Sequence, residues 1–174
     1  MKTKFNQSKL KLAIVSAMLV GSSAISVYTY AGTATSTMNV SVSVAHSCSI
    51  DSNPMAFGTY DGNASTALEA KATVVSTCTS GAAALITMSA GTSAGSGSAE
   101  APVRRMTAGA GEYLVYQVYS DVARGTVWGN TAPTGVAFTG TGVSQTLTAY
   151  GSVPPAQLVA QGVYTDQLSI TITY

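Results

Sequence analysis

The sequence predicts an all-β protein: an antiparallel β-sandwich that lacks one strand and takes that strand from another copy. Two observations carry this prediction. Short runs that alternate apolar and polar residues follow one another, with Gly, Pro, Asn and Asp between them, which is typical of antiparallel strands with one buried face. Residues 38–44 also alternate strictly, although they precede the rest of the β-pattern. They therefore form a predicted strand that is available for a neighbour's sheet.

Residues 1–31 are predicted to be a secretory signal peptide. Four lysines make the start of the chain positive, and an apolar run over residues 12–20 follows. Small residues favour cleavage after either Ala24 or Ala31. The alternative is a membrane anchor, which needs about 20 apolar residues. The serines within this segment argue against an anchor.

Without the signal peptide the chain is weakly acidic. Residues 32–174 contain seven acidic and four basic residues, a net charge of −3, and charged residues make up only 9% of the whole sequence. This composition provides no basic patch for nucleic acid. The repeated Val and Ile runs argue against disorder. The length is that of one domain.

Several further runs are predicted to be strands, and no run has helical periodicity. The predicted strands are residues 68–78, 83–88, 113–119, 125–129, 143–150 and 168–174. Residues 89–100 consist mainly of Gly, Ser, Ala and Thr, so we expect a flexible loop there. Prolines 102, 154 and 155 fall between strands, where a missing N–H group is harmless.

A sandwich without its last strand would expose its core and an edge of unpaired backbone groups. Such an edge invites a strand from another chain, as in the donor-strand complementation of pilins. The spare strand at residues 38–44 suits this role because its apolar side chains share one face. The residues expected to fill the slot are Met38, Val40, Val42 and Val44.

The two cysteines, Cys48 and Cys78, are expected to form a disulfide. Their number is even, and the chain is predicted to be exported to an oxidising compartment. Closing the loop between them would stabilise the fold by roughly 3–4 kcal/mol. The alternative is two buried thiols. Together with His46, the only histidine, the cysteines fall short of a structural zinc set, so no metal site is expected.

No enzymatic site is expected, and hence no catalytic residue and no cofactor. His46 and Ser47 are adjacent in a predicted extended segment, so their side chains point to opposite faces. The scattered acids form no recognisable pair for glycoside chemistry. Arg104 and Arg105 could bind an anion, but an exposed hairpin or a salt bridge is the expected role.

The tyrosines of residues 113–119 and Trp128 could form a platform for carbohydrate. In a strand, however, Tyr113 and Tyr119 lie on the face opposite Tyr116. This division favours packing in the core and between subunits over a sugar site.

The order and spacing of these landmarks resemble the spore coat protein U domain family, which includes subunits of archaic (Csu-type) chaperone–usher pili. Besides the alternation before Ser47, the matching residues are 47–50 (Ser-Cys-Ser-Ile), 57–60 (Phe-Gly-Thr-Tyr), 76–81 (Ser-Thr-Cys-Thr-Ser-Gly), 105–106 (Arg-Met), 113–116 (Tyr-Leu-Val-Tyr), 119–121 (Tyr-Ser-Asp), 128–129 (Trp-Gly), 150–154 (Tyr-Gly-Ser-Val-Pro), 162–166 (Gly-Val-Tyr-Thr-Asp) and 170–174 (Ile-Thr-Ile-Thr-Tyr).

The resemblance implies an incomplete immunoglobulin-like domain over residues 47–174, preceded by a donor-strand extension over residues 32–46. It implies a disulfide between Cys48 and Cys78 that joins the first two core strands. It also implies three kinds of partner: a periplasmic chaperone, an outer-membrane usher and sister subunits. The edge expected to pair with the chaperone consists of Leu168, Ile170, Ile172 and Tyr174.

The function that the resemblance implies is structural. The chain would be exported through the periplasm and would polymerise by donor-strand exchange into a surface fibre for adhesion and biofilm formation. Two alternatives stay open: a spore or cell coat protein of the same fold, and a secreted monomeric carbohydrate-binding module.

Overall fold

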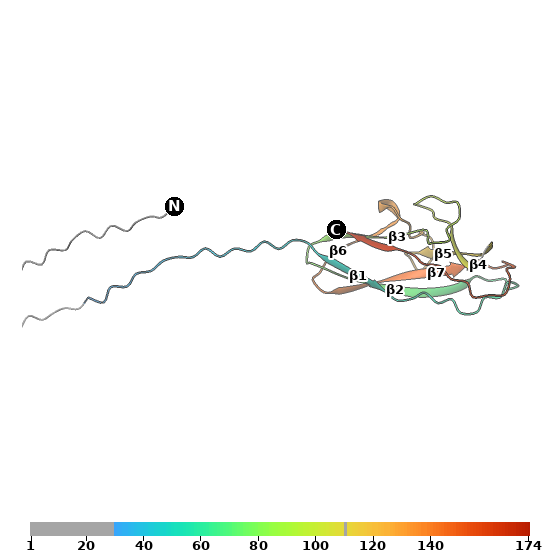
Figure 1. Ribbon diagram of the computed structural model, residues 1–174, viewed down its shortest axis with the longest axis horizontal. Helices are drawn as coiled ribbons and strands as arrows, with labels where there is room; N and C mark the ends of the chain where they lie inside the picture. The colour runs from blue at the N-terminus through green and yellow to red at the C-terminus, as the bar shows by residue number, and fades with distance from the viewer. Residues whose placement is uncertain (1–29, 110) are drawn as a thin grey trace, which may run out of the picture. The chain divides into compact units, whose positions relative to one another are not determined.

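The computed structural model describes residues 30–109 and 111–174, drawn as a ribbon in Figure 1. The chain divides into two units between Ser41 and Val42. In the first unit, residues 30–41 have no regular secondary structure, and all of them are exposed. Every strand of the described chain belongs to the second unit.

The predicted signal peptide lies outside the described residues except for its last two, so both cleavage sites stay predictions. In the part of the chain that is described, no helix combines the length and the apolar character needed to cross a bilayer.

Two antiparallel sheets form the second unit, and Figure 1 shows them as two layers. The larger sheet has the order β1-β2-β7-β5-β4. Its strands are β1 (Cys48–Ser52), β2 (Leu68–Cys78), β7 (Ser144–Val153), β5 (Glu112–Tyr119) and β4 (Arg104–Gly109). The smaller sheet has the order β6-β3-β8. Its strands are β6 (Val136–Thr139), β3 (Ala83–Met88) and β8 (Ile170–Thr173). The predicted all-β antiparallel sandwich is confirmed.

Five of the predicted runs became strands, with bounds that agree to different degrees. The bounds of β2 and β3 agree with the predicted runs, and β5 begins one residue earlier than predicted. Strand β7 continues to Val153, beyond the predicted end at residue 150, because the break comes only at Pro154. Strand β8 is shorter than the predicted run and covers Ile170–Thr173.

Three features of the fold differ from the prediction. Strands β4 and β6 were not predicted, since each is short and β4 begins with two arginines. A short 3₁₀ helix, Ala132–Thr134, interrupts the otherwise all-β chain. The strand predicted for residues 125–129 is wrong: this segment forms only an isolated bridge between Val127 and Tyr119.

The core lies between the two sheets. Its buried members from the larger sheet are Val74, Leu114, Tyr116, Val118, Ala149 and Val153, and those from the smaller sheet are Ile86 and Met88. Trp128 completes this cluster and has no exposed surface. Its indole Nε1 donates a hydrogen bond of 2.8 Å to the carbonyl oxygen of Ile86, which satisfies the one polar group of the buried ring.

Arg104 is also buried, with 0% of its surface exposed, so the expectation of an exposed hairpin or a salt bridge is wrong for this residue. Its guanidinium donates hydrogen bonds to four backbone carbonyls and to one side-chain amide. The acceptors are the oxygens of Met88, Ser89, Val118 and Trp128 and Oε1 of Gln117. Because these groups come from both sheets and from the Trp128 segment, Arg104 links the layers. Burial lowers the pKa of Arg104 to about 10, so the group stays charged at neutral pH.

A loop closed by Asp121 replaces the strand predicted after β5. The carboxylate accepts hydrogen bonds from the backbone N–H groups of Gly125 (3.0 Å) and Thr126 (2.7 Å). These bonds lower the pKa of Asp121. The loop returns the chain to β5, where the N–H of Trp128 donates to the carbonyl of Val118 at 2.9 Å.

We predict that Arg104→Met lowers the free energy of unfolding by about 2–4 kcal/mol, because four carbonyls lose this donor and three of these contacts are buried. Arg104→Lys should also destabilise the chain, since a lysine keeps the charge but lacks the planar fork. Urea unfolding of the oxidised chain measures both effects. The control is Arg105→Met on the partly exposed neighbour. A fully stable Arg104→Met variant would show that apolar packing can replace this clamp.

Asp121 should contribute stability that depends on pH. Because its folded-state pKa is lowered, its contribution is complete above the unfolded-state pKa of about 3.9 and is lost as the pH falls through the folded-state value. We therefore expect Asp121→Asn to lower the thermal midpoint at pH 7 and to match the parent chain in strong acid. A midpoint difference that does not vary with pH would contradict this prediction.

Candidate functional site

The free edges of β1 and β8 lie next to each other (Figure 1). Strand β1 ends the larger sheet and β8 ends the smaller one. Among the described strands, β1 pairs with β2 and β8 pairs with β3, and no ladder joins β1 to β8. Each of the two strands therefore presents an unpaired row of backbone N–H and C=O groups.

A groove begins beside these edges and runs between the sheets. Its first part has a volume of about 300 Å³, and its floor is the apolar core, with Val74, Met88, Tyr116, Val118 and Ala149. One wall carries Met55 and Phe57, from the segment that follows β1. The opposite wall carries Leu168 and Ile170, where the chain enters β8.

The groove continues into a second part of about 800 Å³. The two parts share Met55, Phe57, Met106 and Tyr164. The second part lies between residues 55–63 and residues 157–164. Two of its lining side chains, Leu158 and Val163, are apolar and strongly exposed. The two parts therefore adjoin at these four shared residues, the first over the core and the second towards the exposed side chains.

Gly151 on β7 lets one wall of the groove approach the sheet. A Cβ atom at this position would clash with Sδ of Met55 and with the ring of Phe57. Phe57 in turn meets the ring of Tyr116 edge to face, with the centroids 6.1 Å apart. The wall formed by residues 55–57 thus packs on the floor without being a regular strand.

A hydrogen-bonded polar pair lies in the lining of the first part of the groove. The hydroxyl of Tyr116 donates a hydrogen bond of 2.7 Å to Oδ2 of Asp166. Both residues line the first part of the groove. Burial raises the pKa of Tyr116, and the bond to Asp166 raises it further. The phenol is therefore neutral and acts as a donor at physiological pH.

The four residues of the predicted donor strand are all exposed. Their exposed fractions are 87% for Met38, 88% for Val40, 89% for Val42 and 77% for Val44. Residues 30–47 belong to no strand of the described chain. Their role as a donor is not tested by this geometry and stays a prediction.

The predicted chaperone-pairing edge divides into two kinds of residue. Leu168, Ile170 and Ile172 are half-buried and pack against the core. Tyr174 lies beyond the end of β8 and is 56% exposed. What the edge offers a partner is therefore the backbone of β8 rather than its apolar side chains. Pairing with a chaperone stays a prediction.

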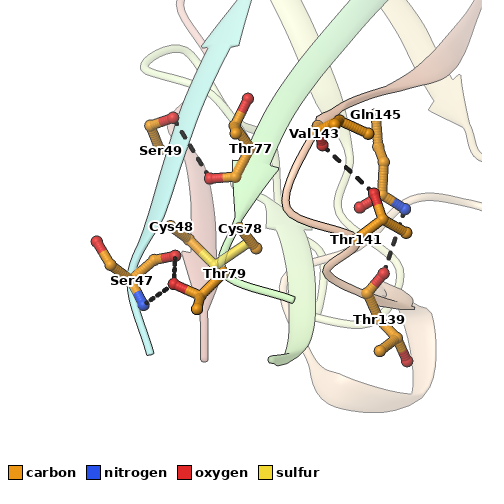
Figure 2. Close-up of a disulfide and its surroundings, with 10 residues drawn as sticks. All are labelled: Ser47, Cys48, Ser49, Thr77, Cys78, Thr79, Thr139, Thr141, Val143 and Gln145. Carbon is orange, nitrogen blue, oxygen red and sulfur yellow. Dashed lines mark hydrogen bonds between the residues drawn. A yellow bond between two sulfur atoms is a disulfide. The ribbon is translucent and has the colours of Figure 1, made fainter. Parts of the chain in front are cut away.

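Cys48 and Cys78 are joined by a disulfide, with an S–S distance of 2.00 Å (Figure 2). The bond links the first residue of β1 to the last residue of β2, which are direct cross-strand partners. The adjacent Thr79 holds Ser47: its Oγ1 accepts from the Ser47 N–H at 3.0 Å and donates to the Ser47 carbonyl at 3.1 Å (Figure 2). The chain is thus fixed to the sandwich from Ser47 onwards.

The aromatic residues considered for carbohydrate do not share a surface. Trp128 and Tyr116 are buried, whereas Tyr113 is exposed on the opposite face of β5. Arg105 stacks on Tyr113, with the guanidinium carbon 3.9 Å from the ring centroid. Arg105 also donates to the carbonyls of Ser93 and Ala94. Within residues 30–109 and 111–174, no cluster of His, Cys, Asp or Glu could hold a metal ion.

Sequence reasoning did not assign roles to several residues of the groove. Met55 and Phe57 belong to a run of only three alternating residues, too short to indicate a strand. Asp166 and Tyr116 both fall in segments that carried the family resemblance. That they meet could not be predicted, because they are far apart in the sequence.

Comparisons with known proteins agree with this architecture. The model of the Spore Coat Protein U domain matches residues 34–171. Protein U of Myxococcus xanthus is 38% identical over 155 residues, which cover 83% of this chain and 87% of that protein.

A solved structure shows the same fold. It is the crystal structure of the CsuC–CsuE chaperone–tip adhesion subunit pre-assembly complex from archaic chaperone–usher Csu pili of Acinetobacter baumannii. The match has a TM-score of 0.54 at 15% identity and covers 75% of this chain, but it spans only 40% of the matched chain. Because the family model covers most of the sequence, the chain belongs to the Spore Coat Protein U domain family.

Proposed function

We propose that this chain is an exported structural subunit that polymerises into a fibre by donor-strand exchange. The observation that carries the proposal is a groove with an apolar floor that opens beside two free strand edges, in a chain whose alternating segment at residues 38–44 is exposed and unpaired. The anchors Met38, Val40, Val42 and Val44 of one copy fill the groove of the next. The proposal is structural and involves no catalysis and no cofactor.

The chemistry of the donor segment suits this groove. Side chains alternate along a strand, so the four anchors enter the slot together while Asn39, Ser41 and Ser43 face water. Burying four such anchors is worth roughly 6–12 kcal/mol, before the cost of ordering the segment is counted. That magnitude is comparable to the 5–15 kcal/mol that typically stabilises a whole domain.

The two free edges favour a strand over another apolar ligand. A groove of this volume would also accommodate a small apolar molecule. Only a strand, however, can pair with β1 on one side and with β8 on the other, satisfying the backbone groups of both edges. An inserted strand would therefore join the two sheets and complete the sandwich.

The donor segment and the groove are different surfaces of the chain, so the contact between copies is heterologous. Repetition of a heterologous contact without ring closure gives an open filament. On this proposal, residues 32–46 are the donor extension and residues 47–174 the accepting domain. The product is a surface fibre that serves adhesion and biofilm formation.

An open apolar groove must be covered before assembly, because an exposed edge of this kind aggregates. We assign this protection to a periplasmic chaperone that pairs with the edge at Leu168, Ile170, Ile172 and Tyr174. An outer-membrane usher then exchanges the chaperone strand for a sister subunit. The fold shared with a chain of the CsuC–CsuE chaperone–subunit complex supports this route.

A second candidate is a coat protein of the same fold, and the match to the Spore Coat Protein U domain favours it. The subunit contact would be the same, but the product would be a surface layer. Electron microscopy of expressing cells distinguishes a fibre from a layer. The carbohydrate-binding alternative has less support, because Trp128 and Tyr116 are buried.

We predict that Val42→Asp abolishes polymer formation, because it places a charge in an apolar groove without a partner. The matched control is Ser43→Asp, which adds the same charge to the face of the donor strand that meets water. Polymer is measured as heat-dissociable ladders of the exported protein on denaturing gels. We expect ladders for the parent chain and for Ser43→Asp only.

Two results would contradict the donor role. One is a normal ladder from Val42→Asp. The other is equal loss of polymer in both variants, because the effect would then be due to charge alone and not to the face that carries it.

A further inference from the structure

The Asp166 carboxylate lies in the wall of the groove, and four donors hold it. The hydroxyl of Tyr116 donates to Oδ2 at 2.7 Å. Oδ1 accepts from the N–H and the hydroxyl of Thr92, at 2.9 and 2.8 Å, and from the N–H of Ser93 at 3.3 Å. Bonds to a charged acceptor are stronger than those between neutral groups. The carboxylate thus joins the groove floor, the groove wall and the loop at residues 89–100.

The backbone around this contact is shaped to receive it. Gly91 has a φ of +94°, and a Cβ atom there would overlap the Asp166 carboxylate, so a side chain is excluded for two reasons. The loop at residues 89–100, expected to be flexible, is held at this point. It is also held by Ser89, whose hydroxyl accepts from the Ser169 N–H at 2.8 Å.

The residue before Asp166 is fixed to the opposite sheet. Thr165 and Thr107 exchange two backbone hydrogen bonds, of 2.9 and 3.0 Å, and so pair the wall with β4. Four residues after Asp166 the chain enters β8 and pairs with β3. The wall at residues 165–170 therefore crosses from one sheet to the other, with Asp166 as its side-chain anchor.

We propose that Asp166 is a positioning residue of the strand-accepting groove: it keeps the wall at residues 165–170 apart from the wall at residues 55–57. Without these bonds, the wall at residues 165–170 can move towards residues 55–57 and narrow the groove, because closure would bury more of the apolar side chains that line it. The proposal rests on the proposed function, since an open slot matters only if a strand enters it. It assigns a role to the Gly-Val-Tyr-Thr-Asp segment that ends at Asp166.

A purely structural role of Asp166 predicts a different result. In that case any loss of strand binding would follow the loss of global stability. The matched control is Asp121→Asn, since Asp121 also accepts two backbone N–H bonds but lies in a loop outside the groove. Asp166→Asn and Asp166→Ala test the anchor, and Asn keeps an acceptor for Thr92 and Ser93.

The experiment measures the binding of a labelled synthetic peptide covering residues 36–46. The full exported chain is used at low concentration with peptide in excess, so that the peptide outcompetes other copies. Association and dissociation rates are recorded by fluorescence anisotropy, and the free energy of unfolding is measured for each variant. We expect Asp166→Ala to bind the peptide about tenfold more weakly, Asp166→Asn to recover part of the loss, and Asp121→Asn to bind like the parent chain.

Three outcomes would overturn the proposal, and they differ in whether the proposed function stands. Parent-like peptide affinity in Asp166→Ala would show that Asp166 does not position the wall, while the proposed function would stand. The second outcome is a loss of peptide affinity that is proportional to the loss of unfolding free energy, in the Asp166 and Asp121 variants alike. It would also show that Asp166 does not position the wall, while the proposed function would stand. No peptide binding by the parent chain would overturn the strand-accepting role itself, and this inference with it.

Discussion

The structure depends on two neighbouring sheet edges that have no partner strand. Strands β1 and β8 end their sheets side by side with unpaired backbone edges, and the apolar space between the layers opens beside them. A sheet can satisfy such an edge only by pairing, and an apolar core can be closed only by apolar side chains. One alternating strand meets both requirements. The exposed segment from Met38 to Val44 has this chemistry. The same sequence therefore contains both the unpaired edges and a segment with the pattern needed to pair with them.

Most of the sandwich could be predicted from the sequence, because strands with one buried face show their pattern locally. The runs that became β2, β3 and β5 extend over six residues or more, and their bounds agree with the structure to within one residue. The shorter strands β4 and β6 were not predicted, because so few residues show little of such a pattern. In β6 only Val136 and Phe138 indicate a face, and in β4 two arginines conceal it. The segment at residues 125–129 looked like a strand, but its backbone is held by the Asp121 carboxylate.

The polar supports of the groove could not be predicted, because their meaning depends on contacts between distant residues. Arg104 looks like a surface residue in the sequence, yet it donates to carbonyls of both sheets, those of Met88 and Val118. Asp166 looks like an isolated acid, yet it binds Thr92 and Tyr116, which lie 74 and 50 residues away. Alternation reports which face of a strand is apolar. It does not report which polar side chain keeps two layers in position.

The disulfide between Cys48 and Cys78 has a mechanical consequence. In a fibre built as proposed, tension along the filament enters each subunit through the short link that precedes Ser47. The residue after it, Cys48, is covalently bonded to β2, which lies inside the larger sheet. This force cannot separate β1 from β2 by breaking their hydrogen bonds one at a time, because the disulfide holds the end of β1 that would separate first. Load passes instead into a strand with partners on both sides, and resistance to stretching becomes a property of the whole sheet.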